Sequence, residues 1–381
     1  MPSKMNFLFG VPMFVGCCAI LWNYWDRLKK PSKPRGLRKK KIFISADCWL
    51  CVFDLLPAYQ LGLGIAQISH RFDFYVDEHF KTRKWTLGKI QIGRKIGKNG
   101  TKKIEIVNSD GKQLPTAQIQ MPRKIIGFRS ITISFIDQNV IAFLHRFRQL
   151  FATNCPINLA IDTTNDRILV FILRNIWPMM VKNIDVLQLS AGIFRRLRQF
   201  VPTILDDCPS LRFVSFTFDK LFAEFPFDDN ATASDGQVVA KWLFTALPDN
   251  VPKMLKCSLD KNDGNLESDI EDFKEAFTNA SSAVNFIFVI RFPWSFAMSV
   301  VPFALTNELT REQLVLKKTS DGRLFVFIRC PIDRDESKWT KWEEEAIGLE
   351  FVDQWNRIDI HINNEDEIGK GLLDAGPSDQ H

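Results

Sequence analysis

Tyrosine is scarce in this chain of 381 residues, and the motifs of common enzyme classes are missing. Three Tyr stand beside 33 Phe, so most aromatic side chains carry no hydroxyl and are suited to filling a hydrophobic core. The sequence has no Gly-x-Ser-x-Gly, no Walker loop and no His-Glu-x-x-His, and Gly62-Leu-Gly64 lacks the third glycine of a dinucleotide-binding loop. We therefore expect a protein that is not an enzyme, with no catalytic residue, no cofactor and no metal.

A disulfide framework is also missing. The eight Cys are scattered without a repeating spacing, which favours a reducing compartment over an oxidising one. Cys48 and Cys51 form a lone Cys-x-x-Cys, whereas a structural zinc site needs a second ligand pair at a suitable distance. We expect both thiols to lie on one helix and to face its core.

A net positive charge is missing from most of the chain, although the net charge of the whole is +6. The segment 1–41 carries ten Lys or Arg and one Asp, a net charge of +9, so the remainder is mildly acidic at −3. Nucleic-acid recognition needs basic charge on the folded domain. No nucleic-acid partner is expected.

The chain has little apolar sequence of transmembrane length, and its longest apolar run is marginal as a span. The longest, Phe7 to Trp22, has sixteen residues and reaches about 24 Å as a helix, against a hydrocarbon core of about 30 Å. The segment 1–41 is thus an apolar segment plus a basic linker, and three interpretations stay open: a membrane anchor, a cleaved signal peptide, or neither. The basic residues after the run favour a cytoplasmic position for the chain from Ile42 onward, and secretion is the weaker alternative.

A helical unit is predicted over residues 42–80. Residues 49–56 are apolar at nearly every position, Leu61, Ile65, Ile68 and Phe72 follow a helical stripe, and Phe72, Val76 and Phe80 continue it. Pro57 separates the first helix from the second, and three short helices are expected in all. A unit of about 40 residues is near the limit at which one core suffices, so its surplus apolar residues predict a partner surface.

This unit resembles an F-box, the module that docks substrate receptors on the Skp1 adaptor of cullin-RING ubiquitin ligases. The resemblance rests on Val52-Phe53, Leu56, Leu61 and Ile68-Ser-His-Arg-Phe72, with Ile44-Ser45 where the family has Leu-Pro. It implies a Skp1-facing surface formed by Ile44, Val52, Phe53, Leu56 and Leu61. The alternative is a small helical subdomain that packs only on its own chain.

An antiparallel β meander is predicted over 81–124. Short alternating runs at 85–92, at 103–107 and near Ile119 are separated by Asn99-Gly100 and Asp110-Gly111, the dipeptides typical of tight hairpins.

An internal repeat is predicted over 125–280. Strand-like runs centred on Ile133, Leu159, Leu187 and Val214 alternate with helix-like runs. Their spacing of about 27 residues lies in the leucine-rich-repeat range. Cys208-Pro-Ser-Leu-Arg-Phe-Val-Ser-Phe216 resembles the strand motif of such repeats. The expected fold class is α/β, a degenerate repeat-like parallel sheet with helices on one side; an ordinary βαβ layer is the alternative.

A β-rich part is predicted over 281–367, followed by a tail at 368–381. Its runs lie at 284–290, 313–316, 324–328 and 358–362, with a turn at Asp321-Gly322 and an amphipathic helix whose Trp339 and Trp342 face the sheet.

From Trp85 onward the chain is also similar to an expanded nematode family of F-box proteins, through segments such as Glu224-Phe-Pro, Ala240-Lys-Trp-Leu and Arg329-Cys-Pro-Ile-Asp. The resemblance implies a substrate receptor of an SCF-type ubiquitin ligase, with a Skp1-like adaptor and cullin complex as partners and an unidentified protein client. A membrane-tethered binding scaffold without a ligase link is the alternative.

Overall fold

The computed structural model describes residues 44–56, 61–82, 85–96, 102–108, 125–152, 156–217, 223–230, 232–258, 266–291, 300–320, 322–348 and 355–373. The chain divides into two units, Met1–Ser45 and Ala46–His381. The apolar run 7–22, whose three interpretations include a membrane anchor, and the basic linker after it lie outside the described residues. Within the described part of the chain, no helix combines the length and the apolar character needed to cross a bilayer.

The segment 46–82 forms two α-helices joined by irregular helical turns. Helix α2 (Ala46–Phe53) is followed by a π turn, η1 (Leu61–Ile65), a 3₁₀ turn, η2 (Ala66–Ile68), and helix α4 (His70–Thr82). Extended backbone at Ser69 separates η2 from α4. The three regular helices predicted here are therefore not confirmed, and a physical reason lies in Gly62 and Gly64, because glycine costs an α-helix about 1 kcal/mol per residue relative to alanine.

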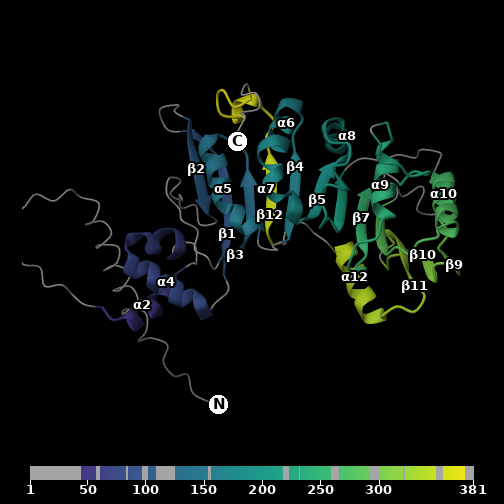
Figure 1. Cartoon of the computed structure of the whole chain (residues 1–381), viewed down its shortest axis with the longest axis horizontal. Helices are drawn as coiled ribbons and strands as arrows, with labels where there is room; N and C mark the ends of the chain where they lie inside the picture. The colour runs from purple at the N-terminus through teal and green to yellow at the C-terminus, as the bar shows by residue number, and fades with distance from the viewer. Residues whose placement is uncertain are drawn as a thin grey trace, which may run out of the picture. The chain divides into compact units, whose positions relative to one another are not determined.

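The rest of the unit 46–381 is built on one twelve-stranded sheet with the order β2-β1-β3-β12-β4-β5-β6-β7-β8-β11-β10-β9 (Figure 1). The strands from β1 to β8 in this order are parallel, β2 pairs antiparallel at one edge, and β11, β10 and β9 form an antiparallel meander at the other. The strand bounds are β1 (Trp85–Ile96), β2 (Lys102–Asn108), β3 (Ile125–Ile133), β4 (Ile157–Asp162), β5 (Ile184–Ser190), β6 (Phe213–Thr217), β7 (Lys253–Ser258), β8 (Phe286–Arg291), β9 (Phe303–Asn307), β10 (Glu312–Lys318), β11 (Phe325–Pro331) and β12 (Arg357–His361).

Strand β12 stands between β3 and β4, although it comes last in the chain. It pairs parallel with both, Ile358 lying opposite Ile131 on one side and Leu159 on the other; in Figure 1 it is the yellow strand among teal ones. The repeat prediction placed the strands centred on Ile133 and Leu159 as successive members of a stack. They are not neighbours, because β12 supplies the hydrogen-bonding edges between them.

Asn356 fixes the start of β12. Its main-chain N–H donates to the carbonyl of Phe128 at 2.8 Å, its side-chain Oδ1 accepts from the Phe128 N–H at 2.9 Å, and its carbonyl accepts from the N–H of Asn158 at 3.1 Å. Asn356 has a φ of 56°, a left-handed conformation that asparagine tolerates better than most residues. One residue thus joins the strand to both neighbours.

Helices cover both faces of the sheet. Alternate strand residues such as Leu187, Val214 and Leu255 share a hydrophobic core with α5 (Gln138–Ala152), α6 (Asp166–Asn175), α7 (Trp177–Met180), α8 (Ala191–Phe200), α9 (Asp235–Leu243) and α10 (Leu266–Thr278). Successive side chains of a strand point to opposite faces, and the neighbouring residues Val186, Phe213 and Met254 pack with α12 (Glu336–Gly348) in a second core. Short 3₁₀ turns are η3 (Val181–Asn183) and η5 (Glu365–Glu367).

Side-chain caps explain where several of these helices begin. The side chain of Asn165 accepts from the N–H groups of residues 167 and 168 at the start of α6, Ser190 accepts from Ile193 in α8, and Ser234 forms a capping box with Gln237 in α9. Such caps satisfy N–H groups that have no partner within the helix.

Most local predictions agree with this fold. It is mixed α/β; the antiparallel pair at 85–92 and 103–107 is confirmed, and the third strand near Ile119 lies outside the described residues. The turn before β11 contains Gly322 at a φ of 70°, and Trp339 of α12 is buried against the sheet, both as predicted. The β-rich runs continue the same sheet as the repeat region.

Candidate docking surface and pocket

The segment 46–82 has a small hydrophobic centre built mostly of aromatic side chains. Phe53 and Val76 are fully buried, and Leu61 and Phe80 nearly so. The ring of Trp49 packs edge-on against Phe72 at 4.8 Å between centroids, and Phe53 packs edge-on against His79 at 5.9 Å. These rings come from α2 and α4, and the buried residues of the segment belong to the same hydrophobic core as the residues of the sheet.

One side of α2 leaves apolar and sulfur-bearing groups exposed. Cys48 and Cys51 are exposed, Val52 is half-buried and Leu55 is 59% exposed. Cys48, Cys51 and Val52 lie on one face of α2, because they are three and four residues apart, and Leu55 follows in the turn after the helix ends at Phe53. This face is opposite the one that presents Trp49 and Phe53. We call these four residues the α2 stripe.

The structure separates the five residues that the sequence assigns to Skp1 binding. Ile44 is 39% exposed, and Val52 and Leu56 are half-buried, so all three reach the surface. Phe53 and Leu61 are buried and belong to the hydrophobic core that continues into the sheet. Sequence reasoning missed Leu55, although its spacing from Cys48, Cys51 and Val52 was a visible signal.

The two thiols of the Cys-x-x-Cys do not face the core. Cys48 and Cys51 are both exposed and neither forms a disulfide, so the prediction that they point inward is wrong; Trp49 and Phe53 take the buried face instead. Among the described residues, no group of three or more potential ligands is placed to hold a metal ion.

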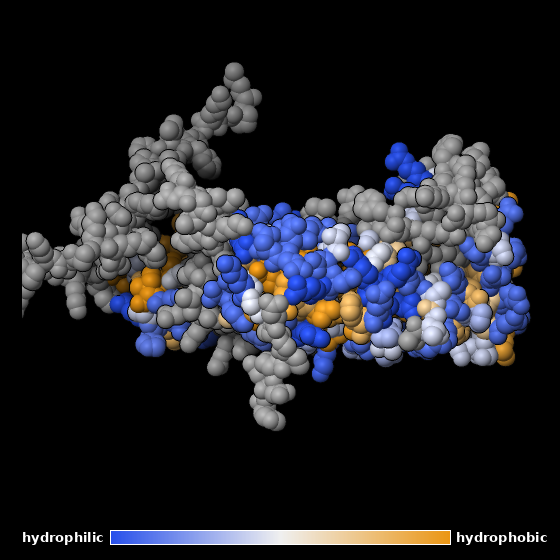
Figure 2. Space-filling model, turned by 90° about the horizontal axis from the view of Figure 1, so that it is seen from above, coloured by the Kyte–Doolittle hydropathy of each residue, from blue (hydrophilic) through white to orange (hydrophobic). Residues whose placement is uncertain are grey.

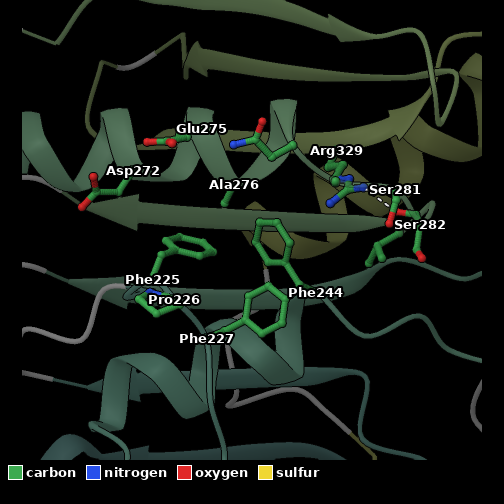
Figure 3. A pocket seen from close by; sticks show the side chains of 13 residues that line it. Phe225, Pro226, Phe227, Phe244, Asp272, Glu275, Ala276, Ser281, Ser282 and Arg329 are labelled. Atoms are coloured by element: carbon green, nitrogen blue, oxygen red, sulfur yellow. Dashed lines mark hydrogen bonds between the residues drawn. The ribbon is translucent and has the colours of Figure 1, made fainter.

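A pocket of about 670 Å³ lies beside α10 (Figure 3). Three phenylalanines, Phe225, Phe227 and Phe244, gather on one side of it, and α10 presents Asp272 and Glu275 on the other. The remaining lining residues are Pro226, Ala276, Asn279, Ala280, Ser281, Ser282, Val284 and Arg329. The segment 224–237 is mostly polar in sequence, yet its Phe225 and Phe227 form part of this wall.

Buried rings hold the aromatic wall in place. Phe244 packs against Phe273 at 5.5 Å and against Phe286 at 5.2 Å between centroids, and Phe225 packs edge-on against Phe244 at 5.2 Å. Phe273 and Phe286 are fully buried. Because these rings have no free space, the wall is preformed rather than assembled on binding.

Arg329 closes the inner end of the pocket. It is fully buried, its Nε and Nη2 donate to Oε2 of the equally buried Glu312 at 3.1 and 2.7 Å, and Nη2 also donates to the Ser282 carbonyl at 2.7 Å. The Cζ atom lies 5.3 Å from the ring centroids of both Phe244 and Phe277. Its Nη1 has no hydrogen-bond partner in the structure, an unusual state for a buried donor.

Two groups with perturbed pKa values lie away from this pocket. Burial lowers the pKa of Lys253 to about 8, with the nearby Asp206 acting in the opposite direction. Burial, and then the charge of Asp229, raises the pKa of the Asp206 carboxyl. Neither residue lines the pocket, so the groups with shifted pKa values and the pocket do not belong to one site.

Comparison with protein-family models, with curated proteins and with solved structures gave no match to this chain.

Hydrophobic residues elsewhere reach the surface in separate patches between hydrophilic ones (Figure 2). Isolated exposed residues of this kind are ordinary on a folded protein. The α2 stripe and the pocket differ from them because each is a contiguous set on a preformed element.

Proposed function

We propose that the chain is the substrate-recognition subunit of an SCF-type ubiquitin ligase. In this function the helical segment docks on a Skp1-like adaptor and its cullin complex, and the α/β body binds a protein client. The observation that carries the proposal is the α2 stripe on a segment whose own centre is already filled by Phe53, Leu61 and Val76. A helix with apolar groups on both faces calls for a second covering surface.

The resemblance of this segment to an F-box identifies the partner that would cover the α2 stripe as a Skp1-like adaptor. Within it, Val52 and Leu55 are the central apolar contacts, and Leu56 extends the surface at its edge. Phe53 and Leu61 hold α2 against the rest of the segment. The mechanism is proximity, because the receptor holds a client while other subunits bring the ubiquitin-carrying enzyme.

The body is further proposed to be a degenerate leucine-rich-repeat-like array. Five successive strands, β4 to β8, stand side by side in parallel with helices between them, which supports a stacked repeat. The insertion of β12 departs from a simple stack, so an ordinary βαβ layer remains the alternative.

Binding to a purified Skp1–cullin complex tests the ligase function. Burying a leucine or valine contributes about 1.5–3 kcal/mol, so we expect Val52→Asp together with Leu55→Asp to weaken binding at least a hundredfold. Titration calorimetry or biolayer interferometry with the full chain measures this loss. Far-UV circular dichroism checks that the helices persist.

Leu309→Asp is the matched control, because Leu309 is 74% exposed in the turn between β9 and β10 and receives the same chemical change. It should bind as the unchanged chain does. Wild-type affinity in the Val52→Asp, Leu55→Asp chain would refute docking through this surface. Absence of any Skp1 binding would leave the membrane-tethered scaffold as the better description.

A further inference from the structure

We infer that the pocket beside α10 binds a short client segment in which an apolar side chain, aromatic or aliphatic, is flanked by Lys or Arg. This inference names the client class and so rests on the proposed receptor function. It is carried by two features of the pocket: an aromatic wall and two carboxylates at the rim.

The aromatic wall selects an apolar side chain. Phe225, Phe227 and Phe244 present ring faces and edges, and the buried Phe273 and Phe286 behind them prevent collapse. Aromatic pairs contribute about 0.5–1.5 kcal/mol beyond the burial of their area. Phe227 is 48% exposed, so an entering apolar side chain can bury part of this ring that is otherwise in contact with water.

The rim selects positive charge. Asp272 and Glu275 are both exposed and line the pocket from α10 one turn apart. Arg329, the only basic residue among the described residues of the lining, is already paired with Glu312. The lining therefore has an excess of negative charge, complementary to a Lys or Arg next to the anchoring side chain.

The inner end of the pocket is rigid. Arg329 is fully buried, and Glu312 and the Ser282 carbonyl hold its guanidinium in place. Its Nη1 is buried without a partner and is not reached from the cavity, so selection by the pocket rests on the aromatic wall and on the charge of the rim.

The open rim favours a peptide over a small metabolite. Pro226, Phe227, Asp272, Glu275, Asn279, Ser281 and Ser282 are all exposed. Small-molecule sites bury most of their ligand, whereas a peptide needs to place only one or two side chains while its main chain continues across the rim.

Three blocked heptapeptides test the inference on the full chain without any ligase subunit. The probe Gly-Ser-Lys-Phe-Lys-Ser-Gly should bind, with an affinity that falls as salt is raised. Its analogues with Glu in place of both Lys, or Ala in place of Phe, should bind at least tenfold more weakly. Fluorescence anisotropy of the labelled peptides measures all three.

Variants then locate the site. Asp272→Asn with Glu275→Gln should weaken the Lys-Phe-Lys probe at least tenfold and remove most of its salt dependence, and Phe227→Ala should weaken it without altering that dependence. Glu267→Gln with Glu271→Gln is the matched control, since it removes the same charge from α10 outside the pocket lining and should leave binding unchanged.

Equal binding of the Lys and Glu peptides, or an unchanged affinity in the pocket variants, would overturn the inference. So would binding of the small aromatic amine tyramine with no binding of the peptide, which would assign a metabolite site. Because Skp1 docking is measured separately through Val52 and Leu55, each proposal can fail while the other stands.

Discussion

Lys253 shows how a single buried charge sets a pH dependence. It is 4% exposed at the start of β7, its Nζ donates to the Trp242 carbonyl at 2.5 Å and lies 5.0 Å from the Trp242 ring centroid, and its pKa falls from 10.5 to about 8 because of burial. Between these two values the unfolded chain binds more protons at this residue than the folded chain. Its contribution to stability therefore rises with pH across this window.

Replacement of this lysine by methionine is expected to stabilise the fold near neutral pH. The free energy of unfolding should increase by up to about 3 kcal/mol at pH 7, the equivalent of the lowered pKa, and the gain should vanish as pH rises from 8 to 10.5. The Trp242 carbonyl keeps the N–H of Phe244 as a donor. Urea denaturation of Lys253→Met measures the difference, and the exposed Lys182→Met should show none.

The buried pair Arg329–Glu312 is expected to respond unequally to single and double replacement. Glu312→Gln leaves the guanidinium charge without compensation and should cost about 3–5 kcal/mol, whereas Glu312→Leu with Arg329→Met should recover part of that loss. The exposed pair Arg311–Asp333, 3.6 Å apart, provides the comparison, and Asp333→Asn should cost less than about 1 kcal/mol. A double replacement no more stable than Glu312→Gln would contradict this account. Denaturant unfolding of all three variants decides.

At the scale of elements, the pairing of β3 with β12, called here the seam, depends on the close approach of the Asn356 side chain to the backbone at Gly127. A Cβ atom added at Gly127 would lie 2.3 Å from Oδ1 of Asn356, the atom that accepts from the Phe128 N–H. No such contact exists at Gly64, where the space within 4 Å of an added Cβ is empty. The position of the Asn356 side chain therefore leaves no room for a Cβ atom at residue 127.

Gly127→Ala is expected to loosen this seam and to lower the free energy of unfolding by about 2 kcal/mol, because either β12 or the Asn356 side chain has to move. Amide exchange should accelerate in β12 and in the facing part of β3. Gly64→Ala should neither lower the free energy of unfolding nor accelerate exchange in β12 and β3. Unaltered exchange in Gly127→Ala would show that the seam tolerates the methyl group.

At the scale of the whole molecule, the sequence predicts local elements better than their partners. The run 358–362 alternates as a strand, yet nothing near it indicates that it pairs between β3 and β4, since that pairing depends on Asn356 and on strand edges that lie far away in the sequence. The pocket escaped prediction for the same reason: Phe225, Asp272 and Arg329 are distant in sequence. Conversely, Trp339 was predicted to face the sheet because helical periodicity is a local property.

The position of β12 also has a consequence for the newly made protein. Strands β3 and β4 leave the ribosome long before residues 357–361 are translated. Until then, the edges of β3 and β4 that pair with β12 in the finished sheet have no partner strand. Bare edges of this kind invite pairing with other chains. A translation product that stops short of β12 carries that hazard permanently, whereas arrival of the strand covers both edges and completes the sheet.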